Sequence, residues 1–175
     1  MDEQRCEGTV RWLIDQLEQK RPKILRVDFY GGEPLLNVPA MEYISKALWE
    51  YAQTTGISFY STIVTNGSLL TEAIVDRLLE YGLGSVKVTL DGDREAHNRK
   101  RPFKNGRGSF DIIVENMLHV VDKVAVSVGG NFDAENKDSI PSLLDYLKEK
   151  GLHEKLMMVD FKPISASLAN RDMGC

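Results

Sequence analysis

Cysteine is scarce in this sequence: only Cys6 and Cys175 occur, near opposite ends of a chain of 175 residues. Two cysteines so far apart give no disulfide framework, which is typical of proteins kept in a reducing cytoplasm. Neither has a second cysteine or a histidine at the spacing of metal ligands. The sequence therefore argues against the disulfide-rich secreted class, predicts a cytoplasmic location and shows no metal site of its own.

Long apolar runs and a strong charge excess are missing as well. No run approaches the roughly 20 residues that a membrane span needs, and the first five residues lack the basic-then-apolar layout of a signal peptide. The net charge of −4 gives no reason to expect nucleic acid or an anionic membrane as a partner. With 42% hydrophobic and 27% charged residues, the composition is that of an ordinary soluble globular protein.

What the sequence does contain is a regular alternation of apolar patterns. Helical spacing predicts a helix at residues 10–17, a second at 39–54, a third capped by Ser68 or Thr71, a fourth capped by Ser109 and a fifth at 140–150. Short apolar runs predict strands at residues 24–30, 57–64, 85–90, 124–128 and 156–161, the fourth ending in Gly129-Gly130. Because there is no low-complexity stretch or Gly/Ser linker, we expect one domain over residues 1–175.

Strands separated by helices in this way should be parallel and joined by right-handed crossovers. A partly closed barrel and an open doubly wound sheet both satisfy this order, and periodicity does not separate them. In either fold, ligands bind at the carboxyl ends of the strands. Those ends carry glycines, hydroxyls, amides, a carboxylate and a cation. Asn66-Gly67 and Asp91-Gly92 also fit ordinary turns, and Gly129-Gly130 also fits a loop without a ligand.

The turn Gly31-Gly32-Glu33-Pro34 follows the first predicted strand. Two glycines free the main chain, the proline fixes the exit, and the glutamate is presented between them. Such a turn can offer carbonyl oxygens and a carboxylate to a bound ammonium group.

Residues 97–109 form a local basic cluster directly after the Asp91-Gly92 strand end. The cluster fits a solvated loop or a nucleic-acid contact. It also fits a loop whose arginine folds back over a ligand at the strand ends, because a guanidinium matches a carboxylate in two-point geometry. We interpret His97 as structural or as a surface residue.

These segments together resemble one family. Gly31-Gly32-Glu33-Pro34 resembles the GGEP motif of radical S-adenosylmethionine (SAM) enzymes. Residues 65–70 (Thr-Asn-Gly-Ser-Leu-Leu) and 88–92 (Val-Thr-Leu-Asp-Gly), followed by His97, Arg101-Pro102 and residues 106–110, are similar to motifs of one branch. That branch contains anaerobic sulfatase-maturating enzymes and peptide maturases with a SPASM extension. The matches stand in the family's order over residues 24–131.

The resemblance implies a partial parallel (β/α)6 TIM-like barrel, represented here from its first helix through its sixth strand. In the family, a [4Fe–4S] cluster reductively cleaves SAM to methionine and a 5′-deoxyadenosyl radical, which abstracts a hydrogen atom from the substrate. The resemblance thus implies a radical SAM oxidoreductase that modifies a peptide or protein side chain and takes electrons from a flavodoxin or ferredoxin. Sulfatase maturation is the alternative within the family.

The resemblance also assigns cofactor-binding residues. Gly31, Gly32 and Glu33, with Pro34 completing the motif, would receive the amino group of SAM. Thr89, where the family commonly has serine, and Arg101 would receive its carboxylate. Ser127 and Asn131 would face the ribose or the methionyl part, and Pro163-Ile164 would border the adenine. Thr65 and Asn66 belong to the same expected set.

One departure from the family is large: its C-x3-C-x2-C cluster motif, which follows the first barrel strand, occurs nowhere in this sequence. We therefore expect a fragment that lacks the first strand, holds no cluster alone and does not cleave SAM. The rival interpretation is a non-catalytic nucleotide-binding α/β module with an open doubly wound sheet.

Overall fold

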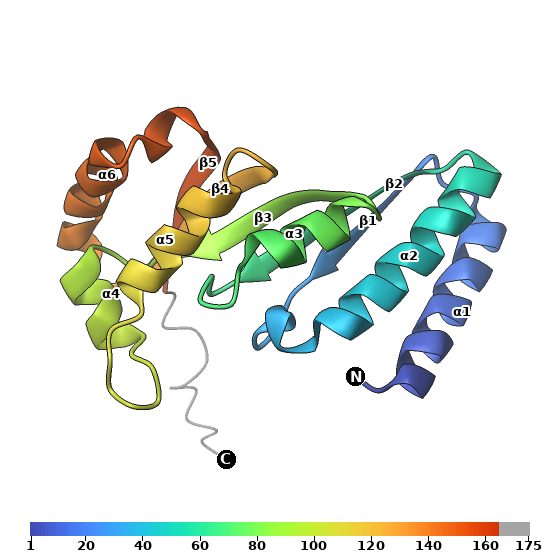
Figure 1. The fold of residues 1–175 in the computed structure, drawn as a ribbon, viewed down its shortest axis with the longest axis horizontal. Helices are drawn as coiled ribbons and strands as arrows, with labels where there is room; N and C mark the ends of the chain where they lie inside the picture. The colour runs from blue at the N-terminus through green and yellow to red at the C-terminus, as the bar shows by residue number, and fades with distance from the viewer. Residues whose placement is uncertain (165–175) are drawn as a thin grey trace, which may run out of the picture.

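The computed structural model describes residues 1–164, so Cys175 lies outside the described residues. Its strands form one parallel sheet in the order β1-β2-β3-β4-β5 (Figure 1). The bounds are β1 Ile24–Phe29, β2 Ser58–Thr65, β3 Leu83–Thr89, β4 Ala125–Phe132 and β5 Leu156–Pro163. Each strand pairs with the next one in the chain, so the order of the strands across the sheet is the same as their order in the sequence.

Helices connect the strands, as the alternation of patterns predicts. They are α1 Glu3–Lys20, α2 Val38–Thr55, α3 Glu72–Leu79, α4 Arg94–Lys100, α5 Phe110–Val120 and α6 Ile140–Glu149, with short 3-10 turns η1 Pro34–Asn37, η2 Lys137–Ser139 and η3 Leu152–Glu154. Among the described residues, no helix is both long and apolar enough to cross a membrane. Of the two caps expected for the third helix, Thr71 is the one used, since its hydroxyl accepts the Ile74 N–H.

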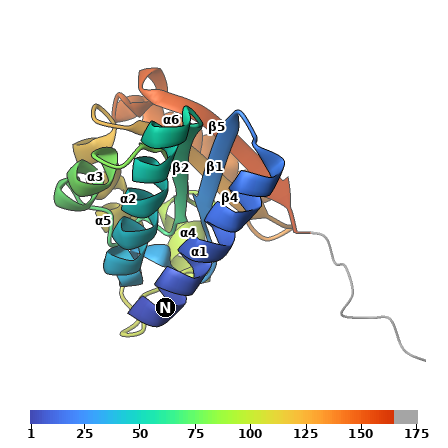
Figure 2. The same cartoon turned by 90° about the vertical axis from the view of Figure 1, so that its right-hand side faces the viewer.

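The helices cover one face of the sheet. Side chains such as Ile63, Val88 and Val128 alternate along their strands and are fully buried in a core shared with α3, α5 and α6. A second buried cluster joins α1 and α2 to β1 and β2. Figure 1 shows α2, α3 and α5 in front of the strands, and Figure 2 shows α1 and α2 side by side. The opposite face carries polar side chains, among them Lys87 and Asp160.

This arrangement decides between the two folds left open by the sequence. A doubly wound sheet reverses its strand order at a switch point and carries helices on both faces. Here the order never reverses and the core helices lie on one face, so the doubly wound alternative is wrong. The parallel sheet is that of a partial TIM-like barrel, as expected.

Three local predictions need correction. First, the sequence predicts no helix at the start of the basic cluster, but the structure has α4 there. Asp93 caps this helix by accepting the Ala96 N–H. Ser109 stands at the start of α5 but makes no side-chain cap there, because its hydroxyl donates to the Arg101 carbonyl instead.

The third correction concerns β4, which does not end at the glycine pair but continues through it to Phe132. Both glycines pair with β5. A side chain at Gly130 would clash with the Leu90 carbonyl, and one at Gly129 would clash with Lys87. Gly130 is thus needed for close approach of the Leu90 backbone inside the sheet rather than for a loop, whereas at Gly129 the nearest atoms are the flexible end of the Lys87 side chain.

Candidate functional site

The carboxyl ends of the strands form three neighbouring hollows, and most of the expected site residues line one of them; Gly32, Thr65 and Ser127 line none of the three. The first, of about 390 Å³, is lined by residues that include Gly31, Glu33 and Pro34. The second, of about 150 Å³, is lined by Asn66 and Arg101 among others. The third, of about 300 Å³, contains Thr89, Asn131, Lys87, Asp160 and Lys162. Tyr30 borders both the first hollow and the third.

The turn after β1 has the backbone that its two glycines suggest. Gly31 has a φ of 100° and Gly32 a φ of 50°, both in the region that residues with a Cβ avoid. No atom lies within 4 Å of a Cβ built at either position, so conformation and not space requires glycine here. Both residues are exposed. Gly31 lines the first hollow, whereas Gly32 is exposed beside it.

Glu33 joins this turn to the end of β2. One carboxylate oxygen accepts the Thr65 hydroxyl at 2.7 Å and the Leu35 N–H at 3.1 Å, and the other accepts the Asn66 N–H at 2.8 Å. A carboxylate has about four acceptor positions. Three are thus occupied by the protein, and one remains for a ligand. Sequence reasoning predicted the ligand contact of Glu33 but not this bracing of two loops.

Thr65 and Asn66 are held mainly by the protein itself. The Thr65 hydroxyl, which donates to Glu33, also accepts the Gly67 N–H at 3.0 Å. The Asn66 side chain accepts from the N–H and the hydroxyl of Ser68, which is ordinary turn chemistry. The Asn66 side chain therefore serves the turn, as the turn interpretation of Asn66-Gly67 predicts. Thr65 and Asn66 lie at the edge of the candidate site.

Arg101 folds back toward the strand ends, as one interpretation of the basic cluster expects. Its Nε donates to the carboxylate of Asp91, whose side chain is 7% exposed, whereas the Arg101 side chain is 39% exposed. Within residues 1–164, the terminal nitrogens of Arg101 donate no hydrogen bond. The guanidinium is thus anchored on one side and open on the other.

Thr89, Ser127 and Asn131 occupy different environments. Thr89 and Asn131 line the third hollow. Ser127 is 3% exposed in the middle of β4, and its hydroxyl has no hydrogen-bond partner among the described residues. In the third hollow, Lys87 Nζ lies 2.6 Å from Asp160 Oδ1. This ion pair links β3 to β5 across Gly129. The hollow thus contains an ion pair that sequence reasoning did not predict.

His97 is buried, in agreement with its structural interpretation. It is 0% exposed, and its ring packs edge-on against Phe110 with ring centres 5.9 Å apart. Burial lowers the pKa of His97 from 6.5 to about 4; the charge of Arg101 acts in the same direction and that of Asp91 opposes it. His97 is therefore neutral at physiological pH.

The described residues do not fit an iron–sulfur cluster. No group of three or more His, Cys, Asp or Glu side chains among residues 1–164 could hold a metal ion. Cys6 is buried in the cluster between α1 and α2. The strand ends do fit the polar part of SAM, because carbonyls, a carboxylate and an open guanidinium gather there.

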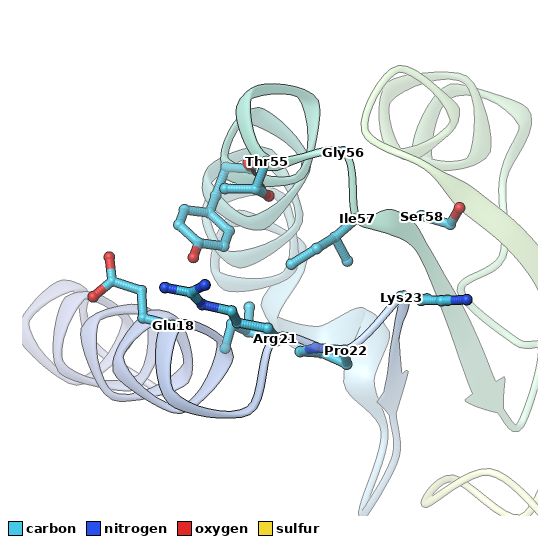
Figure 3. A pocket seen from close by; sticks show the side chains of 10 residues that line it. Glu18, Arg21, Pro22, Lys23, Thr55, Gly56, Ile57 and Ser58 are labelled. Carbon is cyan, nitrogen blue, oxygen red and sulfur yellow. Dashed lines mark hydrogen bonds between the residues drawn. The ribbon is translucent and has the colours of Figure 1, made fainter.

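A hollow of greater volume, about 820 Å³, lies at the opposite edge of the sheet (Figure 3). Residues 21–23, before β1, and residues 55–58, before and at the start of β2, line it. Figure 3 shows Arg21 pointing into the space between the ends of α1 and α2. In TIM-type barrels the amino edge is the stabilising face and the carboxyl edge is the functional one. The volume of a hollow is therefore not enough to identify the functional site.

A family model described as "Radical SAM superfamily" matches residues 9–147, which is well over half of the chain. The chain belongs to the radical SAM superfamily. This membership confirms the family resemblance seen in the sequence motifs.

Similar proteins include members with different reactions. Fe-coproporphyrin III synthase of Methanosarcina barkeri is 34% identical over 141 residues, or 79% of this chain and 32% of the relative. A serine-type anaerobic sulfatase-maturating enzyme of Bacteroides thetaiotaomicron is 29% identical over 163 residues, or 89% and 36%. The chain thus spans about a third of the length of these relatives. Sulfatase maturases among the relatives agree with the expected branch.

A solved structure, native anSMEcpe with bound AdoMet, has a TM-score of 0.77 to this chain at 21% identity. The likeness covers 93% of this chain and 43% of that one. At this level of identity the comparison supports the fold, a partial radical SAM barrel.

Proposed function

We propose that this chain is a core-barrel part, a single domain, of a radical SAM oxidoreductase and that it binds SAM along the carboxyl edge of its sheet. The observation that carries the proposal is the gathering of unlike polar groups at that edge. Gly31 and the Glu33 carboxylate line one hollow, and Arg101 lines the next. A zwitterionic amino acid needs such a pair of unlike partners.

Each end of the methionyl group has its own partners in this proposal. The ammonium group binds the remaining acceptor position of Glu33 and the carbonyls of the glycine turn. The carboxylate binds the terminal nitrogens of Arg101 in two-point geometry, together with the Thr89 hydroxyl. Asn131 and Ser127 take the ribose side, and Pro163-Ile164 borders the adenine. The chain's own role is to orient the cofactor and to exclude water.

The cluster chemistry itself needs ligands that the described residues do not supply. When bound in members of this family, the cluster supplies the electron that cleaves SAM, and a flavodoxin or ferredoxin would supply that electron here. We expect no cleavage by this chain alone. After anaerobic iron–sulfur reconstitution, absorbance of a stoichiometric 4Fe cluster on this chain would contradict that expectation.

A peptide or protein side chain is the substrate class that we propose for the whole enzyme. Relatives include a PqqA peptide cyclase and two serine-type anaerobic sulfatase-maturating enzymes. Sulfatase maturation remains the alternative within this class. A cytoplasmic location is part of the same proposal, because only two cysteines occur in the sequence.

Titration calorimetry with SAM tests the binding site. The chain should bind SAM, and L-methionine should compete, because it carries the same ammonium and carboxylate groups. Glu33→Gln and Arg101→Gln should each weaken SAM binding about ten-fold or more, since each removes a charged partner. Arg99→Gln, on the exposed surface of α4, is the matched control and should bind as the parent chain does. Absent binding, or equal binding by all variants, would contradict the proposal.

A further inference from the structure

One buried carboxylate connects three segments at the functional edge. Asp91, two residues after the end of β3, accepts the Arg101 Nε–H on one oxygen and the Asn131 N–H on the other, the latter at 2.7 Å. Asp91 is therefore not only a turn residue. It fixes the guanidinium in the loop after α4 relative to the end of β4.

The main chain of Asp91 is fixed by two further buried side chains. Its N–H donates to His97 Nδ1 at 3.2 Å, and its carbonyl accepts from Asn136 Nδ2 at 2.7 Å. The Asn136 amide also donates to the Asn131 carbonyl at 2.9 Å. Asn136 is 1% exposed. The position of the Asp91 carboxylate is thus set from both sides.

The hydrogen bonds determine which nitrogen of His97 carries the proton. The Ser109 hydroxyl donates its single hydrogen to the Arg101 carbonyl at 2.7 Å. It therefore accepts at its 3.1 Å contact with His97 Nε2, which must be the protonated nitrogen. Nδ1 is then bare and accepts the Asp91 N–H. A neutral imidazole is the only form that serves both contacts.

We infer that Asp91 and His97 are positioning residues for Arg101 and, through it, for the carboxylate end of the ligand. Asp91 holds the guanidinium by Nε, so the terminal nitrogens stay open. His97 and Ser109 hold the Arg101 main chain relative to Asp91. We call Asp91, His97, Arg101, Ser109 and Asn136 the arginine anchor. That the ligand is SAM rests on the proposed function; the anchoring of Arg101 does not.

A measurement without ligand tests the anchor itself. In the NMR spectrum of the ¹⁵N-labelled chain, the Arg101 Nε–H should give a resolved signal protected from exchange with water, and His97 should show the Nε2–H tautomer near neutral pH. Asp91→Asn should remove the protection of the Arg101 signal. Asp93→Asn, the same substitution two residues away, should leave it unchanged, because asparagine caps α4 as well as aspartate does. An Arg101 signal that Asp91→Asn does not alter would overturn the inference.

Titration with SAM then tests the effect on the site. We expect Asp91→Asn to weaken SAM binding about ten-fold, from the loss of one charge-assisted hydrogen bond. His97→Gln keeps a donor for Ser109, whereas His97→Met has nearly the same length and none. The glutamine variant should therefore bind SAM more tightly than the methionine variant, with urea midpoints showing that both are folded.

The two proposals fail in different ways. If Arg101→Gln abolishes SAM binding while Asp91→Asn and both His97 variants bind like the parent chain, the anchor is wrong and the site stands. If the chain binds no SAM but the Arg101 signal depends on Asp91, the anchor stands and the proposed function is wrong.

Discussion

Acid should destabilise this protein through the buried side chain of His97. His97 is 0% exposed, and its pKa is lowered from 6.5 to about 4, mainly by burial. In the unfolded chain the imidazole takes up a proton near pH 6.5, whereas the folded chain keeps it neutral down to about pH 4. Lowering the pH through this window therefore favours the unfolded state.

The magnitude follows from the width of the window. One unit of pKa difference corresponds to about 1.4 kcal/mol, so the free energy of unfolding should fall by about 2.5 kcal/mol between about pH 7.5 and pH 4.5. Two carboxylates act at lower pH. A hydrogen bond from Thr62 lowers the pKa of Asp28, and one from Lys100 lowers that of Asp133, both from 3.8. Their contributions are lost only as the pH falls through these lowered values.

Urea unfolding, followed by tryptophan fluorescence at the two pH values, measures this effect. In His97→Gln the pH-dependent loss should be smaller by about 2.5 kcal/mol, whatever the substitution costs at neutral pH. His119→Gln, at an exposed position of α5, is the control and should keep the full loss. Equal pH-dependent losses in the parent chain and in His97→Gln would show that His97 does not cause the acid destabilisation.

Three further substitutions at or near the site, with Gly8→Ala as a control, are tested by their effect on the urea midpoint. Gly32→Ala should lower the free energy of unfolding by about 1 kcal/mol, because φ is positive at Gly32. Gly8→Ala, on the open surface of α1, should raise it by a similar amount. Equal effects of the two substitutions would contradict backbone strain at Gly32. Gly130→Ala should cost about 2 kcal/mol or more through the clash with the Leu90 carbonyl, and a neutral result would show that β4 shifts freely. Asn116→Ala should cost about 1–3 kcal/mol, because its buried amide donates to two carbonyls of the loop after β2; an unchanged midpoint would contradict this role.

The fold was largely predictable because its signals are local. Buried strands read as short runs of β-branched residues, and the longer helices carry an apolar stripe. Helix α4 was not predicted because it has no such stripe. Within α4, only Ala96 and His97 are buried. Its cap, Asp93, was the one local signal that could have revealed it.

The sequence nominates residues to face a ligand, and these stay a prediction, but it does not show what holds those residues in place. The motifs pointed to Glu33 and Arg101 through family resemblance. They did not reveal that Asp91 pairs with Arg101 or that it accepts the Asn131 N–H from 40 residues away. Asn136 carried no signal at all, since an isolated asparagine in a polar loop resembles any turn residue. Hydrogen-bond partners that are far apart in the chain can be identified only in the folded structure, where the pairing of the strands brings them together.

We propose that the ligand binds at the carboxyl edge, although a hollow of greater volume lies at the other edge. A ¹H–¹⁵N correlation spectrum of the chain titrated with SAM tests it residue by residue. We predict the largest shifts at Gly31, Arg101 and Asn131, with little change at Lys23 and Gly56 in the hollow of Figure 3. The largest shifts at Lys23 and Gly56 would instead place the ligand at the amino edge of the sheet.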